Sequence, residues 1–306
     1  MVATGVLPPL IRLLQHPDPT ILIPALHTFW NMSMRICGDR QTAAVINARL
    51  LPALRPLLFH AHTEIRQEAM CAVSHSQRRT RAHTERWRIQ GATARRVCPS
   101  SHPVDSVFLS FLPRLSPVAV CGSHQIQACL DAGLLSVVIE SLLSNSDEEQ
   151  MLQCVYALAN ALNGGSVLQV CRLVTHTPSV LAALNVLLAS SREFLLHVAL
   201  RSLERVMQVG VILSNGSLDA ETAAAVAAMG LSGHRPFTAR VAATCMRNLH
   251  AVASSNKIDL HIASDANRIL KTWWSKAEAK DAMTAANAAT AAPSSTGSSC
   301  SSAARR

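Results

Sequence analysis

The fold is decided by two similar stretches, GVLPPLIRLLQHPDPTILIPALHTFWNM at residues 5–32 and RLLPALRPLLFHAHTEIRQEAMCAVSH at residues 49–75. Pro8 and Pro52 are 44 residues apart, and the same distance separates Asn31 from His75. A third version, AGLLSVVIESLLSNSDEEQMLQCVYALAN, occupies residues 132–160, and a fourth, weaker version, SVLAALNVLLASSREFLLHVALRSLERVM, occupies residues 179–207. A period in the mid-forties is typical of stacked helical repeats, whose units are ~40 to 47 residues long.

Each version has the same internal order of segments. An apolar run such as LPPLIRLL (7–14) or LLSVVIESLL (134–143) spaces its Leu and Val residues at three and four, which predicts a helix. A polar break, HPDP (16–19) or NSDEE (145–149), then turns the chain before a second amphipathic helix. One such unit cannot bury its apolar faces alone, so the units must stack into an all-α, right-handed superhelix with a long groove. Composition agrees, because 49% of the residues are hydrophobic and only 4% are aromatic.

Net charge gives a second, different interpretation. The chain carries a formal charge of +9, which suits binding to nucleic acid through phosphate contacts. The excess is concentrated, however: residues 76–121 hold eight Arg against Glu85 and Asp105. Because no basic stripe recurs on the predicted helices, we do not expect the repeats to bind nucleic acid.

Catalytic and metal sites are not expected. The nine cysteines include no CxxC pair, and Cys129, Cys154 and Cys245 lie in apolar helical patterns, which predicts reduced, buried thiols. The histidines lack ligand spacing, so no metal or other cofactor is expected. Cys171 and His176 do not share a helix face, and no nucleophile, base and orienting group occur together, so the sequence predicts no enzyme.

Membrane segments are not expected either. The start of the chain, MVATGVLPPL, lacks a basic region ahead of an apolar run and so does not read as a signal peptide. The longest uncharged stretch, residues 173–191, contains His176, Pro178 and Asn185, which predicts a loop followed by a buried helix.

The last helix of each unit resembles a known family. In order, ILIPALHTFWN (21–31), EIRQEAMCAVSH (64–75), QCVYALANALNGG (153–165) and LLHVALRSLERVMQVG (195–210) resemble the third helices of four consecutive armadillo repeats in the C-terminal half of importin-alpha. The resemblance implies an armadillo α-solenoid that binds proteins bearing Lys/Arg-rich nuclear localisation signals and works in the cytoplasm and the nucleus. In that family the concave face is a ladder of Trp and Asn residues one helical turn apart, with a carboxylate one turn before the Trp.

The spacing of this ladder suits an extended basic peptide. Residues four apart project from one helix face, so an Asn can hold the peptide backbone while the Trp walls a slot for a lysine stem. The carboxylate then meets the ammonium group.

Carried over residue by residue, the ladder is incomplete. In the first unit Asn31 matches the ladder Asn and His27 lies one turn before it. The resemblance places the remaining positions in the next two units: Glu68 as the carboxylate, with Cys71 for Trp and His75 for Asn, and then Gln153 for the carboxylate, Tyr156 for Trp and Asn160 as the ladder Asn. Since each missing Trp forfeits about 1 to 2 kcal/mol, we expect weak peptide binding.

Other family features are absent or altered. The sequence lacks the importin-beta-binding segment and the repeats of the main signal site. The stretch ASDANRILKTWWSKA (263–277) resembles the helix near the family's export-receptor site. Residues 76–121 have no counterpart, and two explanations stay open: a translated intron or a genuine basic loop.

We therefore expect two units in residues 1–75, a basic insert at 76–121, and two clear units plus degenerate terminal helices at 122–281. A disordered Ala/Ser tail is expected at 282–306. A general armadillo scaffold with a different partner is the alternative function.

Overall fold

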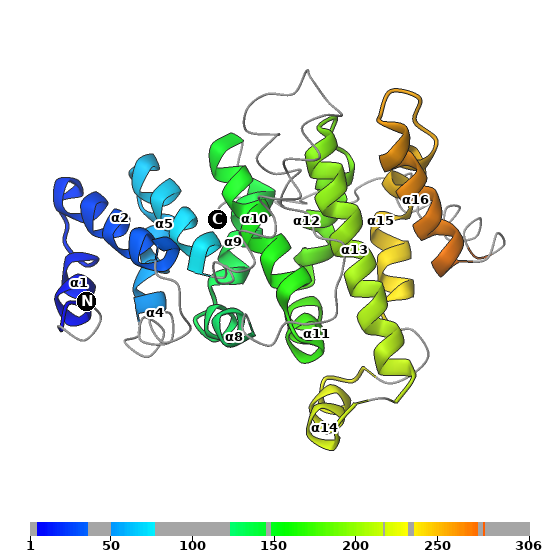
Figure 1. Ribbon diagram of the computed structural model, residues 1–306, viewed down its shortest axis with the longest axis horizontal. Coiled ribbons are helices and arrows are strands. Elements are labelled where there is room, and N and C mark those ends of the chain that lie inside the picture. The colour runs from blue at the N-terminus through cyan, green and yellow to red at the C-terminus, as the bar shows by residue number, and fades with distance from the viewer. Residues whose placement is uncertain are drawn as a thin grey trace, which may run out of the picture.

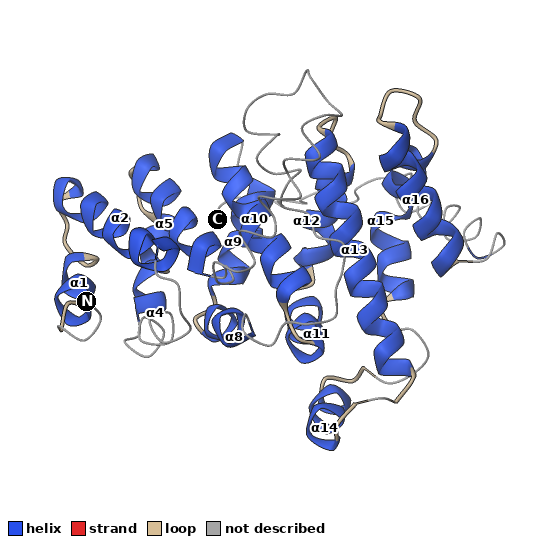
Figure 2. Cartoon of the chain, in the orientation of Figure 1, coloured by secondary structure: helices blue, strands red, loops and turns tan. Residues whose placement is uncertain are grey.

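The computed structural model describes residues 5–35, 50–76, 123–144, 148–216, 218–231, 236–274 and 278. Every regular element among these residues is a helix and none is a strand (Figure 2). The prediction of an all-α chain is confirmed.

The helices form three rows that run along the molecule. The row that carries the candidate site, here called the third-helix row, consists of α2 (Pro19–Arg35), α5 (Thr63–Ser76), α10 (Glu148–Gly164), α13 (Glu193–Ser214) and α16 (Leu260–Trp273). The second-helix row consists of α1 (Leu7–Leu13), α4 (Leu50–Leu54) with the 3-10 helix η2 (Pro56–Phe59), α9 (Leu134–Ser144), α12 (Ser179–Leu188) and α15 (Thr238–Ala253). The first-helix row consists of α8 (Ser123–Asp131), α11 (Val167–His176) and α14 (Ala220–Ala228).

Neighbouring members of each row pack directly on one another. In the third-helix row α2 contacts α5, α5 contacts α10, α10 contacts α13 and α13 contacts α16. The same succession links α4, α9, α12 and α15, and it also links α8, α11 and α14. Figure 1 shows the resulting elongated stack, with the third helices following one another from the blue end to the orange end. This arrangement is an α-solenoid, in which a unit contacts mainly its neighbours.

Side-chain caps fix the starts of α11, α14 and α16. Ser166 and Gln169 form a reciprocal capping box at the start of α11, and Asp219 accepts the Thr222 N–H at 2.8 Å at the start of α14. Asp259 does the same for α16 through the His261 N–H at 2.7 Å. Because the first turn of a helix leaves its N–H groups unpaired, these oxygens define where each helix begins.

The core is continuous along the stack. It consists mainly of Leu, Val, Ile and Ala, as the period predicts, and includes the fully buried Phe29 and Phe237. Burial of such side chains gives roughly 25 cal/mol per Å² of apolar surface, so stacking supplies the stability that no single unit has.

The units on either side of residues 77–122 are neighbours in space, since α5 packs on α10. The predicted insert (76–121) falls almost wholly outside the described residues, and so does the predicted tail (282–306). The domain division stays a prediction.

The last three described helices, α14, α15 and α16, form one further three-helix unit. α14, α15 and α16 join the first-, second- and third-helix rows in turn, where only degenerate helices were expected. α14 is rich in Ala and buries only Val226, which explains why its sequence carries so little periodic signal.

Candidate peptide-binding face

The third helices share one burial pattern, which fixes their register. On three successive third helices, half-buried side chains recur three or four residues apart, with buried residues between them. They are Glu68 and Cys71 on α5, Gln153, Tyr156 and Asn160 on α10, and His197 and Arg201 on α13. Side chains at this spacing lie on one face of a helix. Five of the predicted site residues therefore lie on matching faces of α5 and α10, and we call the whole set of seven residues the row face.

His27 and Glu68 meet at the junction of α2 and α5. The His27 Nε2 atom lies 3.1 Å from the Glu68 Oε1 atom, and the two side chains are 47% and 26% exposed. Sequence reasoning placed both residues at the site but did not pair them. The carboxylate that was expected to receive a peptide lysine already has a partner within the chain.

Ser74 links Gln153 and Asn160 at the junction of α5 and α10. Its hydroxyl lies 3.0 Å from the Gln153 Oε1 atom and 3.0 Å from the Cys71 carbonyl oxygen. The Asn160 Nδ2 group donates to the Ser74 carbonyl oxygen at 3.1 Å. An amide side chain has two N–H donors and one carbonyl acceptor, so Asn160 keeps hydrogen-bonding capacity for a ligand.

Tyr156 packs toward the following helix. Its ring centroid lies 6.0 Å from that of Phe194 on α13, with an interplanar angle of 49°. This tilted arrangement is a favourable aromatic contact and holds the Tyr156 ring between α10 and α13. Cys71, at the equivalent position on α5, is half-buried.

Asn31 and His75 lie within α2 and α5, respectively. Their side chains lie outside the part of the chain that the structure describes. Their roles in binding stay predictions.

Sequence reasoning did not assign Arg201 on α13, which has the register of Asn160. No hydrogen bond or ion pair reaches its guanidinium from the described residues, and its Nε atom is buried without a partner among them. Burial, with a further contribution from Arg201, lowers the pKa of His197 one turn earlier. The sequence could have indicated Arg201, since the matching segments 153–165 and 195–210 place it at the position of Asn160, 41 residues later.

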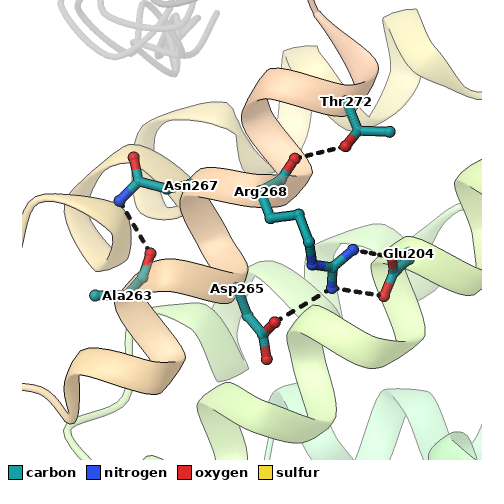
Figure 3. A network of polar contacts seen from close by, with 6 residues as sticks. All are labelled: Glu204, Ala263, Asp265, Asn267, Arg268 and Thr272. Carbon is teal, nitrogen blue, oxygen red and sulfur yellow. Dashed lines mark hydrogen bonds and ion pairs between the residues drawn. The ribbon is translucent and has the colours of Figure 1, made fainter. Parts of the chain in front are cut away.

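The last unit is fixed to α13 by an ionic network (Figure 3). Arg268 on α16 makes a bidentate contact with Glu204 on α13, with one distance of 3.1 Å, and lies 3.3 Å from Asp265. The hydrogen bonds to Glu204 raise the pKa of Arg268. The sequence did not indicate Arg268 and Glu204 as partners, because a contact between positions 64 residues apart leaves no local pattern.

The cysteines behave as the sequence predicted. Cys129, Cys154, Cys171 and Cys245 are buried, and none of them forms a disulfide within the described part of the chain. Burial raises the pKa of Cys154, Cys171 and Cys245 to about 12, which suppresses thiolate chemistry.

The described residues contain neither a metal-binding cluster nor a single membrane-spanning helix. In them no group of three His, Cys, Asp or Glu side chains could hold a metal ion. No single described helix is long and apolar enough to cross a membrane; two bent helix pairs, 124–131 with 134–144 and 167–176 with 179–188, reach that length and composition only when joined.

The Armadillo/beta-catenin-like repeat matches residues 1–34 and 38–75. Together with the three rows of helices, this match defines an armadillo-repeat α-solenoid, a class of scaffold that binds proteins.

The chain is similar to importin alpha subunits over part of its length, which confirms the resemblance. Importin subunit alpha-1b of Oryza sativa subsp. japonica is 42% identical over 71 residues, which make up 22% of this chain and 13% of that protein. Importin subunit alpha-8 of Arabidopsis thaliana is 23% identical over 167 residues, covering 54% of this chain and 37% of that protein. The matched stretches thus span well under half of these relatives. The structure is also similar to that of a designed armadillo repeat protein solved in complex with the peptide (KR)4. The similarity covers 92% of this chain and 98% of the designed protein, at 21% sequence identity and a TM-score of 0.47.

Proposed function

We propose that the row face binds an extended peptide rich in Lys and Arg, of the kind that serves as a nuclear localisation signal. The observation that carries the proposal is the shared register of Glu68, Gln153, Tyr156 and Asn160 on two adjacent helices. A carboxylate, two amides and an aromatic ring on one face offer a cation partner, backbone hydrogen bonds and a surface for lysine stems.

The internal contacts set the expected affinity. A peptide lysine must compete with His27 for Glu68, and a peptide backbone group finds one Asn160 N–H already bonded to Ser74. Each new contact therefore replaces an existing one and contributes little net free energy, about 0.5 to 1.5 kcal/mol per hydrogen bond. We expect dissociation constants in the micromolar range or weaker.

Similarity to importin alpha subunits supports wider proposals of cargo adaptor function and of residence in cytoplasm and nucleus. Binding of an export receptor to residues 263–277 also stays a proposal. In this segment Trp273 and Trp274 are 8% and 6% exposed, so such a receptor would contact the polar residues of α16 instead.

A peptide titration tests the proposal. Fluorescence anisotropy would follow a Lys/Arg-rich peptide and its Ala-substituted counterpart against the full chain and the Glu68→Gln variant. Glu140→Gln is the matched control, because Glu140 is exposed on α9 in the second-helix row. The basic peptide should bind more tightly than its counterpart, and only Glu68→Gln should weaken it, by about threefold.

Equal affinity of the two peptides would reject the signal-binding function. Equal loss in both variants would assign the effect to overall charge. In either case the general scaffold with another partner becomes the better interpretation.

A further inference from the structure

We infer that the row face takes a peptide of mixed charge, with its basic residues at α5 and α10 and an acidic residue at Arg201 on α13. The inference rests on the proposed function and adds the kind of side chain that the α13 position selects.

Arg201 is the reason for this assignment. It occupies the α13 position equivalent to Asn160, is half-buried, and donates no hydrogen bond and forms no ion pair to any described residue. A guanidinium carries five N–H donors in a fork that matches a carboxylate. A partly desolvated cation without a counter-ion favours an incoming anion and repels a peptide lysine at this position.

Within the part of the chain that the structure describes, the nearby charged groups do not neutralise Arg201. The carboxylates of Glu204 and Asp265 are both engaged by Arg268. Arg205, one turn later, donates to the Gly165 carbonyl oxygen at 3.1 Å and adds positive charge. Burial, together with the charges of Arg201 and His261, lowers the pKa of His197, which disfavours its charged form.

The geometry also sets a spacing in the peptide. Glu68 and Arg201 are separated by two interhelical steps, each about 10 Å, and by seven positions along the helix register, or about 10 Å of rise. Their separation is therefore roughly 22 Å, which an extended peptide covers in about six or seven residues at 3.3 Å each.

Three peptides of equal length test the inference at fixed ionic strength. The first carries a basic segment alone. The second adds one Glu six residues from the central Lys, prepared with the Glu on either side to allow both peptide directions. The third places that Glu two residues from the Lys. The second peptide should bind about fivefold more tightly than the third in one of its two orders.

Variants of Arg201 identify the source of the preference. Arg201→Gln should abolish the preference for the second peptide over the third, and Arg201→Lys should keep part of this preference. Arg247→Gln, which changes an exposed residue of α15, should leave the preference intact. Circular dichroism confirms that each variant is folded.

The outcomes separate the two proposals. The mixed-charge inference is overturned if the parent chain binds the second and third peptides equally, or if Arg201→Gln keeps the preference for the second peptide. The affinity for the basic peptide would still support the proposed function in that case. Failure of the first peptide to bind more tightly than its Ala counterpart, with the preference for Glu intact, overturns the proposed function alone.

Discussion

Removal of the Arg268 side chain should loosen the last unit of the solenoid and leave the others unchanged. Arg268 contributes two contacts to Glu204, whose side chain is 11% exposed, while its own side chain is 47% exposed. Hydrogen bonds to charged groups contribute about 1.5 to 3 kcal/mol, and the exposure of Arg268 puts its share at the lower end, near 1.5 to 2 kcal/mol. Arg268→Leu should therefore increase local opening of α15 and α16 by about 10- to 30-fold.

Hydrogen exchange read by mass spectrometry measures this effect unit by unit, which suits a solenoid whose end unfolds separately. Arg247→Leu on α15 is the control, since Arg247 is exposed and lies outside the network. The double variant Glu204→Leu with Arg268→Leu should exchange more slowly than Arg268→Leu alone, because it leaves no buried carboxylate without a partner. Faster exchange spread evenly over all units, or a double variant as unstable as the sum of its single changes, would refute the reasoning.

Three further predictions follow from the structure. Gly165→Ala should destabilise the chain by about 1 to 3 kcal/mol in denaturant unfolding, because its Cβ would lie 2.5 Å from the Ala161 carbonyl oxygen; Gly164→Ala, which meets only the end of Ile126 at 3.3 Å, is the tolerated control. Burial raises the pKa of Cys154 and Cys245 from 9.0 to about 12, so a thiol reagent at pH 8 should label neither residue until denaturant is added. The contribution of the two protonated thiols to the free energy of unfolding should be complete below pH 9 and should decline as the pH rises toward 12. Cys71→Trp combined with His75→Asn should tighten binding of a Lys/Arg-rich peptide by about tenfold in anisotropy titration, whereas unchanged affinity would remove α5 from the proposed site.

The repeat could be predicted because local and tertiary signals coincide in it. The 44-residue period brings Pro8 and Pro52 to the same place in two units, and the apolar positions of each helix are those that stacking buries. The last unit carries a weaker sequence signal for a physical reason: α14 has the sequence AETAAAVAA and is mostly exposed, and α13 extends as far as Ser214.

The residues of the candidate site could be located from the sequence, but their partners could not. Register places Glu68 and Asn160 on one common helix face, whereas the contacts to His27 and Ser74 depend on how neighbouring helices lie side by side. Arg201 was available in the same alignment and went unassigned because the family ladder gives no role to a cation at that position.

Internal pairing of the polar groups on the row face is the reason why we expect weak peptide binding there. At the junction of α5 and α10, polar groups of the two helices lie within hydrogen-bonding distance of each other. Ser74 is accordingly 3.0 Å from Gln153, and Asn160 spends one donor on the Ser74 carbonyl. These bonds hold α5 to α10, so a peptide that recruits the same groups exchanges one hydrogen bond for another and gains only the difference. Selectivity must then come from groups without an internal partner, and on the described part of the row face Arg201 is such a group.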